Sequence, residues 1–252
     1  MLQPSGWLDR PAAQVDNPEG RAPVVLVCDH ASNWVPAALL NLGLSVEDLD
    51  SHIAWDPGAL AVAQQLAVLL DAPLVHATVS RLVLDVNRDP ANPSSVTTMS
   101  ESTPVPGNCN VSADDRARRV RDVYDVYHRL LASIITAQLA RRALPTLVAI
   151  HSFTPVYRDQ RRPWHVGVLS DTDRRLAQPL IEFLRKSGAL EVGDNQPYAP
   201  SDGVYHTLAR HSAPCGLQSV MIELRADLID NAASQQRWAR SLRDALNVST
   251  LR

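Results

Sequence analysis

Residues 23–30 read PVVLVCDH, and this stretch decides the class of fold that we expect. Pro23 is followed by five apolar residues without interruption, and then by an acid and an imidazole, Asp29 and His30. A valine-rich run of this length is typical of a strand that is buried on both faces. Such strands belong to parallel sheets that helices cover on both sides. The stretch therefore predicts a central strand of an α/β fold, with polar groups at the point where the strand ends.

Outward from this strand, short apolar runs alternate with longer amphipathic stretches. Further strands are predicted at 73–86 (one strand or two), 146–150, 165–170 and 219–224. Helices are predicted from about 56 to 71 and over 112–142, 172–187, 202–211 and 231–247. This alternation predicts a three-layer α/β/α fold with a mostly parallel central sheet. Because no linker separates two cores, we expect one domain over 1–252, with 1–20 as an irregular N-terminal extension.

The composition excludes several classes of function. A net charge of −3 gives no field that favours nucleic acid or an anionic membrane. The three cysteines lie far apart and form no C-x-x-C pair, which argues against a zinc knuckle or a disulfide framework. Neither a signal peptide nor an apolar run of the roughly 20 residues that span a bilayer is visible, so we expect a cytoplasmic protein. The nucleotide-binding motifs and the G-x-S-x-G nucleophile elbow are also missing.

One segment, 89–110, has neither the strand nor the helix pattern. It contains four prolines and seven serines or threonines. A stretch of this length without regular structure is either disordered or a functional loop. Since it follows a predicted strand end that is rich in polar residues, we favour a loop over a site.

Chemically active side chains follow four of the predicted strands. They are Asp29-His30, Asn87-Arg88, His151 and the pair Glu223 and Arg225. Ligands of open α/β sheets bind outside the carboxyl ends of the strands, so we expect these groups in one pocket. Two imidazoles there can bind a divalent metal such as Zn²⁺, and a catalytic site needs a third protein ligand. The candidates for that ligand are Asn33 and Asp56, and Glu223 is the candidate for the acid–base group.

The arginines indicate the charge of the ligand. Arg81, Arg88 and Arg225 near one pocket imply an anionic substrate, because guanidinium groups bind carboxylates with two hydrogen bonds. Arg81 alternatively forms a structural pair with Asp85, which itself is expected to orient Arg88 or a ligand from behind. Tyr205, on a predicted helix, is a candidate for binding a second carboxylate or an acyl oxygen, and packing is the alternative.

Seven segments, in this order along the chain, resemble the N-formylglutamate amidohydrolase family. They are CDHASNWVP (28–36), HIAWDPGA (52–59), SRLVLDVNR (80–88), IHSFTP (150–155), RPWHVGVL (162–169), GDNQPY (193–198) and IELRADL (222–228). Each segment alone is weak evidence, whereas the ordered set is highly specific. Together the segments represent most of the chain from 24 to 245.

The resemblance implies a fold, a reaction and a set of roles. The fold would be phosphorylase/hydrolase-like, as in zinc-dependent exopeptidases and the aspartoacylase and succinylglutamate desuccinylase group. His30 and His151 fall on metal ligands of that group, and Asn33 stands where the group has glutamate. Asp85 to Arg88, with Arg81 upstream, fall on the segment that binds the substrate carboxylate, and Glu223 falls on the general base. Asp29, Asp56 and Asp85 remain as supporting groups or alternative ligands.

The reaction that the resemblance implies is hydrolysis of N-formyl-L-glutamate to formate and L-glutamate. It would use Zn²⁺ and belong to amino-acid catabolism, in particular histidine degradation. Two alternatives stay open. One is a deacylase or peptidase for another N-acyl amino acid, and the other is a catalytically silent protein that binds an anionic metabolite. Asn33, a neutral and weak zinc ligand, is the residue that keeps the silent protein in consideration.

Overall fold

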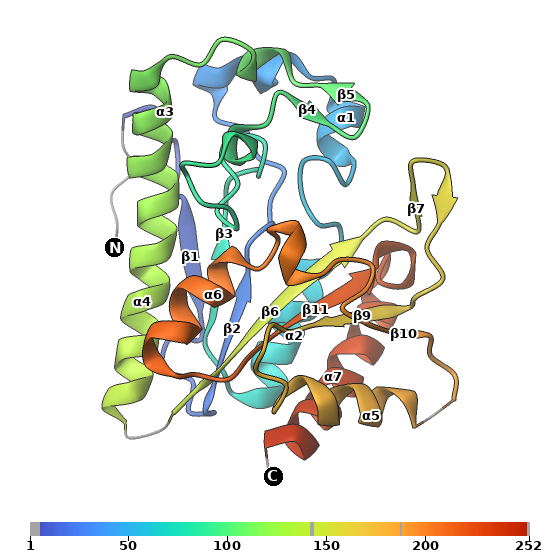
Figure 1. Ribbon diagram of the computed structural model, residues 1–252. Coiled ribbons are helices and arrows are strands. Elements are labelled where there is room, and N and C mark those ends of the chain that lie inside the picture. The colour runs from blue at the N-terminus through green and yellow to red at the C-terminus, as the bar shows by residue number, and fades with distance from the viewer. Residues whose placement is uncertain (1–5, 142–143, 187, 251–252) are drawn as a thin grey trace.

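A computed structural model describes residues 6–141, 144–186 and 188–250, and in this part of the chain a seven-stranded sheet forms the centre (Figure 1). Across the sheet the order is β1-β3-β2-β6-β11-β9-β10. The strands are β1 (Ala13–Asp16), β2 (Val24–Cys28), β3 (Leu74–Ala77), β6 (Thr146–Phe153), β9 (Val166–Leu169), β10 (Val192–Asp194) and β11 (Ser219–Arg225).

The four central strands, β3, β2, β6 and β11, run parallel to one another. Strand β1 is antiparallel to β3 at one side, and β9 is antiparallel to β11 at the other. The prediction of a mostly parallel sheet is thus confirmed. Its consequence is that β2, β6 and β11 end at the same edge, where parallel α/β sheets bind their ligands.

Helices cover both faces of the sheet (Figure 1). On one face lie α2 (Ala59–Leu70), α5 (Ala177–Arg185) and α7 (Ala232–Thr250), and on the other lie α4 (Asp125–Ala140) and α6 (His206–Ser212). Residues of β2 alternate between the two cores. Val25 and Val27 belong to the core under α4, whereas Val24, Leu26 and Cys28 belong to the core under α2. A strand covered on both faces therefore requires the uninterrupted apolar run.

The N-terminal segment is more regular than the sequence predicts. Residues 13–16, expected to be irregular, form β1, which pairs with β3 from Ala13 opposite Ala77 to Asp16 opposite Leu74. Four residues are too few for a visible period of two, and the free edge of β3 supplies the hydrogen-bonding partner. Residues 1–5 of the predicted extension lie outside the described residues.

Of the two alternatives for 73–86, one strand or two, the structure has one strand, β3. Residues 82–86 are buried but form turns. The amide of Val83 donates to the carbonyl of Ser80 at 3.0 Å, and the amide of Asp85 donates to the carbonyl of Ser95 at 2.8 Å. An apolar run only signals burial, and here turn and loop carbonyls satisfy the backbone in place of a neighbouring strand.

Segment 89–110 forms an ordered loop beside the carboxyl edge of the sheet, as favoured over disorder. It contains short 3₁₀ turns at Pro93–Val96 and Pro106–Asn108 and a hairpin of β4 (Met99–Ser100) and β5 (Thr103–Pro104). Its base is held from α3 (Ala113–Arg119), where Arg116 donates to the carbonyls of Pro90 and Asn92. Other short elements include α1 (Val46–Asp50) and a hairpin of β7 (Val156–Tyr157) and β8 (Gln160–Arg161). Of the helices in the described residues, none combines the length and the apolar character that a membrane span needs.

Candidate active site

A pocket of about 400 Å³ lies at the carboxyl edge of the central strands. His30 follows β2, His151 lies near the end of β6, and Glu223 lies opposite His151 in β11. All three line the pocket and are at least 95% buried. The volume is within the range of about 300–1,000 Å³ that is usual for small-molecule sites. The predicted convergence of these three side chains is therefore present.

Asp56 reaches the same place from the loop before α2. Its amide donates to the carbonyl of His30 at 2.9 Å, which fixes the loop next to the end of β2. Gly58 then begins α2 with φ +79°, and a Cβ there would lie 2.4 Å from the carbonyl oxygen of Ile229. Only glycine allows both this backbone conformation and this close approach. The loop therefore holds Asp56 in the pocket.

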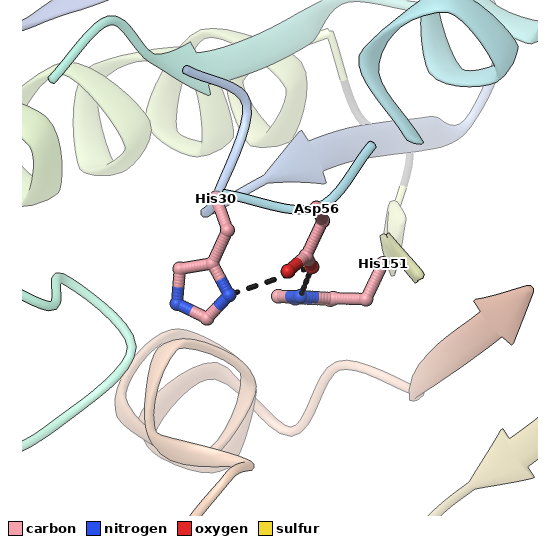
Figure 2. Close-up of side chains that lie close together, drawn as sticks. All are labelled: His30, Asp56 and His151. Atoms are coloured by element: carbon pink, nitrogen blue, oxygen red, sulfur yellow. Dashed lines mark hydrogen bonds and ion pairs between the residues drawn. The ribbon is translucent and has the colours of Figure 1, made fainter. Parts of the chain in front are cut away.

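The side chains of His30, Asp56 and His151 point toward one another (Figure 2). Asp56 Oδ2 lies 2.8 Å from His151 Nδ1 and 3.4 Å from His30 Nδ1. One ligand atom from each residue falls within 4.8 Å of the other two, which makes this buried group suitable for holding a metal ion. Two imidazoles and one carboxylate leave a fourth position open in a tetrahedral arrangement, as catalytic zinc sites do.

A second carboxylate binds the other nitrogen of each imidazole. His30 Nε2 lies 2.7 Å from Asp85 Oδ1, and His151 Nε2 lies 3.0 Å from Asp29 Oδ2. Asp29 Oδ1 in turn accepts hydrogen bonds from the hydroxyls of Tyr127 and Thr207, both at 2.7 Å. When both Nε2 atoms carry the proton, both Nδ1 atoms are free as ligands. Carboxylates in this position orient metal-binding histidines and raise their basicity.

The residues fit a divalent cation. His30 Nδ1 is buried, and within the described part of the chain its nearest polar contact is the 3.4 Å ion pair with Asp56, with no hydrogen bond of good geometry. Buried polar atoms are rarely left in this state without a ligand. Burial raises the pKa of the Asp56 carboxyl, but His30 and His151 outweigh burial and hold that pKa far below its usual value. For His151, burial lowers the pKa, yet its bonds to Asp29 and Asp56 raise it well above the usual value. Strong negative charge around the two imidazoles is what a bound cation would neutralise.

Glu223 stands beside this group as an acid–base candidate. It is 4% exposed, and among the described residues its Oε2 atom has no hydrogen-bond partner. Burial raises the pKa of Glu223 to about 7, while His151 lowers the pKa and Asp56 raises it. A carboxyl group whose pKa is near neutrality can both accept and return a proton.

Two of the predicted arginines also line the pocket, Arg81 and Arg88. Arg81 Nη2 donates to Asp85 Oδ2 at 3.2 Å, and Arg88 Nε lies 3.4 Å from the same oxygen. Asp85 thus holds His30 with one oxygen and both guanidinium groups with the other. Arg81 therefore forms the structural pair with Asp85 that was the alternative to substrate binding. Its guanidinium group also lines the pocket.

The structure does not place Asn33, a predicted third metal ligand, beside the two histidines. Its side-chain nitrogen donates to Asp50 Oδ1 at 3.0 Å, at the surface, and Asp56 takes its place beside the histidines. The loop from 31 to 36 leaves the strand in a direction that depends on its packing, so spacing from His30 could not place it.

Three of the predicted substrate-binding residues have other partners. The side chain of Asn87 lines the pocket, but its nitrogen donates to the carbonyl of Val204 at 2.5 Å and its oxygen accepts from the amide of Thr207 at 2.9 Å. Arg225 donates to Asp227 Oδ1 at 2.8 Å and lies outside the pocket lining. The hydroxyl of Tyr205 lies 3.3 Å from Ser219 Oγ, at the opposite end of β11. Each of these side chains thus has a partner within the protein, and of the three Asn87 lines the pocket.

Other pocket residues were missed by reasoning from the sequence. Tyr198 lies at the end of GDNQPY, a segment recognised only as a family motif, and Arg158 lies at the tip of the β7–β8 hairpin. The β4–β5 hairpin contributes Glu101, whose Oε1 lies 3.1 Å from His52 Nε2. Loop residues carry no periodicity, so the signals for these residues were the family motif around Tyr198 and the composition of 89–110, which predicted a loop over a site without naming Glu101.

Comparisons with known proteins agree with this geometry. A sequence model described as N-formylglutamate amidohydrolase matches residues 22–230. The crystal structure of a gene product from Agrobacterium tumefaciens is 41% identical, with 96% of each chain covered and a TM-score of 0.94. That of an N-formylglutamate amidohydrolase from Ralstonia eutropha is 19% identical, with 96% of this chain and 98% of that chain covered and a TM-score of 0.65. At 19% identity the second likeness shows the fold alone. A search of curated proteins found no match.

Proposed function

This chain belongs to the N-formylglutamate amidohydrolase family, hydrolases of amide C–N bonds, and from this premise we propose that it hydrolyses N-formyl-L-glutamate to formate and L-glutamate. The observation that carries the proposal is the group of His30, Asp56 and His151 beside Glu223, in one pocket with Arg81 and Arg88. Its working place would be the cytoplasm, in amino-acid catabolism such as histidine degradation.

The proposed metal is Zn²⁺, held by His30 Nδ1, His151 Nδ1 and an oxygen of Asp56. When bound, it supplies a Lewis acid that polarises the acyl group and lowers the pKa of water. Asp85 and Asp29 keep the two imidazoles in the orientation and tautomer that ligation needs.

The chain's own groups would handle the proton and the substrate. Glu223 takes the proton of the attacking water through its unbonded Oε2 and delivers it to the departing nitrogen. Arg88, and Arg81 with it, bind carboxylate oxygens of the substrate at the end of the pocket near Asp85. This fixes the acyl carbon near the water and contributes to the rate through positioning.

A catalytically silent binder is disfavoured by the same geometry. Asn33 suggested an incomplete ligand set, whereas Asp56 completes one. In a protein that only binds carboxylates, a buried acid such as Glu223 would repel the ligand and contribute nothing to binding. The acyl group is less constrained, since a pocket of about 400 Å³ accepts substituents larger than formyl.

The proposal is tested by two variants assayed for formate release in Zn²⁺-loaded enzyme. Glu223→Gln keeps the volume but cannot accept a proton, so kcat should fall by about 10²-fold or more with substrate affinity retained. Arg88→Lys keeps the charge but loses the two-pronged geometry, so KM for N-formylglutamate should rise most.

N-formyl amino acids with neutral side chains serve as the comparison substrates. Wild-type kcat in Glu223→Gln would remove Glu223 as the acid–base group. Unchanged KM for every acidic substrate in Arg88→Lys would overturn the carboxylate assignment. Hydrolysis by wild-type protein that has been stripped of metal would refute the metal-dependent reaction.

A further inference from the structure

Tyr198 lies in the pocket wall, and the mechanism above gives it no role. It is half-buried, and its hydroxyl oxygen accepts a hydrogen bond of 2.9 Å from Arg162 Nη1. Arg162 is only 9% exposed, and its guanidinium carbon lies 4.7 Å from the centre of the Tyr198 ring and 4.5 Å from that of Tyr157. The buried guanidinium of Arg162 thus lies against the rings of Tyr198 and Tyr157 and donates to the hydroxyl of Tyr198.

The guanidinium of Arg162 has no carboxylate partner in the part of the chain that the structure describes. Its hydrogen bond to Tyr198 and its contacts with the aromatic rings take the place of an ion pair. Among the described residues, the Tyr198 hydroxyl donates to no protein group. A phenol has one hydrogen to donate, and here it remains available to a ligand in the pocket.

The phenol stays protonated, which a donor requires. Burial raises the pKa of Tyr198, and the negative charge of Glu223 raises it further, while Arg162 and Arg81 lower it. Tyr198 and Glu223 line the same pocket, so the phenol and the acid–base candidate face one cavity. Arg88, which would bind a substrate carboxylate, lies beside Asp85 in the same pocket.

The backbone under Tyr198 is built for this position. A Cβ on Gly167 would lie 2.1 Å from the carbonyl oxygen of Gln196, and one on Gly193 would lie 2.6 Å from it. Two glycines in neighbouring strands therefore let the loop before Tyr198 lie directly on the sheet. Gly167 is also the register partner of Glu223 across β9 and β11, so this loop lies over the acid.

Arg225 supports the backbone at Arg162, the partner of Tyr198. Its Nη1 atom lies 3.3–3.4 Å from the carbonyl oxygens of Arg162, Pro163 and Trp164. The residue predicted to bind substrate thereby fixes the backbone from which Arg162 reaches Tyr198.

Resting on the hydrolase function above, we propose that the Tyr198 hydroxyl donates a hydrogen bond to the acyl oxygen of the scissile amide as negative charge develops there. Arg162 is a positioning residue that orients the phenol and strengthens its donor. The proton remains on Tyr198 throughout, so no bond is made or broken at this residue. A donor aimed at a developing oxyanion stabilises the transition state more than the substrate.

The test is Tyr198→Phe, which removes one oxygen, compared with Tyr205→Phe, the same change at a tyrosine outside the pocket. For Tyr198→Phe we expect kcat on N-formylglutamate to fall by about 10²-fold. Metal content, and inhibition by L-glutamate, which has both carboxylates but no acyl oxygen, should stay at wild-type values. Tyr205→Phe should retain wild-type kcat.

A double-mutant cycle separates positioning from general structural support. Arg162→Gln should lower kcat in the wild-type background and have little further effect in Tyr198→Phe, since Arg162 acts through the phenol. Equal losses in both backgrounds would refute this coupling.

Two results would overturn the role of Tyr198 while leaving the hydrolase function intact. One is a kcat within twofold of wild type in Tyr198→Phe. The other is an unchanged kcat with weaker inhibition by L-glutamate, which would make Tyr198 a carboxylate-binding residue. Failure of the wild-type, Zn²⁺-loaded enzyme to release formate would instead overturn the proposed function, and the role of Tyr198 with it.

Discussion

Asp56 Oδ2 is shared between His151 Nδ1 and His30 Nδ1, at 2.8 and 3.4 Å. Removal of this carboxylate would leave two buried imidazoles facing one another without the charge that compensates them. A buried charged network tolerates such a loss poorly. At the scale of single residues, Asp56 is therefore the group on which cation binding depends most directly.

We predict that Asp56→Ala lowers the affinity for Zn²⁺ by more than about 10²-fold, because even groups that only orient ligands contribute about 10- to 100-fold. Metal content after dialysis against graded chelator, with formate release, gives the measurement. Asn33→Ala is the matched control, since the Asn33 side chain donates to Asp50 at the surface and its loss should leave both quantities unchanged. Loss of metal in Asn33→Ala together with its retention in Asp56→Ala would show that the ligand set is wrong.

At the scale of elements, the start of α2 decides where Asp56 lies. Gly58 begins the helix in the left-handed region and packs against the backbone of Ile229, close to the start of α7. The helix, the loop and the ligand are thus positioned by one contact between two segments that are far apart in the chain.

Gly58→Ala should destabilise the fold by about 1–3 kcal/mol, since the added methyl group forces the backbone to shift. The same shift should weaken Zn²⁺ binding. Gly216→Ala is the control, because Gly216 also has a positive φ, +62°, but no atom within 4 Å of an added Cβ. It should cost only the conformational strain, about 1 kcal/mol, and leave the metal in place. Denaturant unfolding and metal content would be compared, and equal behaviour of the two variants would contradict the packing argument.

At the scale of the whole molecule, a pair of histidines joins α4 to α6 behind the pocket. His128 Nδ1 lies 2.9 Å from His211 Nε2, and His128 Nε2 lies 2.9 Å from the carbonyl oxygen of Val86. Burial, together with the neighbouring His211, lowers the pKa of His128 to about 3. Burial, together with Arg210, lowers the pKa of His211 to about 4. Asp29 and, for His128, the Val86 carbonyl act in the opposite direction. The folded protein keeps both rings neutral.

This pair should make the fold sensitive to acid. The ordinary pKa of histidine is about 6.5, so below that pH the unfolded chain binds protons that the folded chain does not. The free energy of unfolding should therefore decrease as the pH falls from about 6.5 toward 4, by roughly 1 kcal/mol per pH unit for each histidine. In His211→Gln the slope should be smaller over this range. Identical slopes for wild type and variant, measured by urea unfolding at a series of pH values, would count against the pair.

The sequence by itself determined the fold class, the family and three members of the site. Uninterrupted apolar runs such as VVLVC are typical of a strand covered on both faces, and neighbouring parallel strands end at one edge of the sheet. His30, His151 and Glu223 could therefore be placed in one pocket from their positions alone. The ordered motifs identified the family because their arrangement is rare, independent of any packing detail.

Only the tertiary structure showed which residue lies beside the two histidines as the third candidate ligand, and which loop residues line the pocket. Asn33 and Asp56 were both candidates from their place in the sequence. The contact of Gly58 with Ile229 fixes the loop that directs Asp56 into the pocket, whereas the side-chain amide of Asn33 donates to Asp50 at the surface. Arg225 and Tyr205 likewise found partners at Asp227 and Ser219. The direction of a loop side chain depends on contacts with residues far away in the chain, and local pattern and spacing contain no record of those contacts.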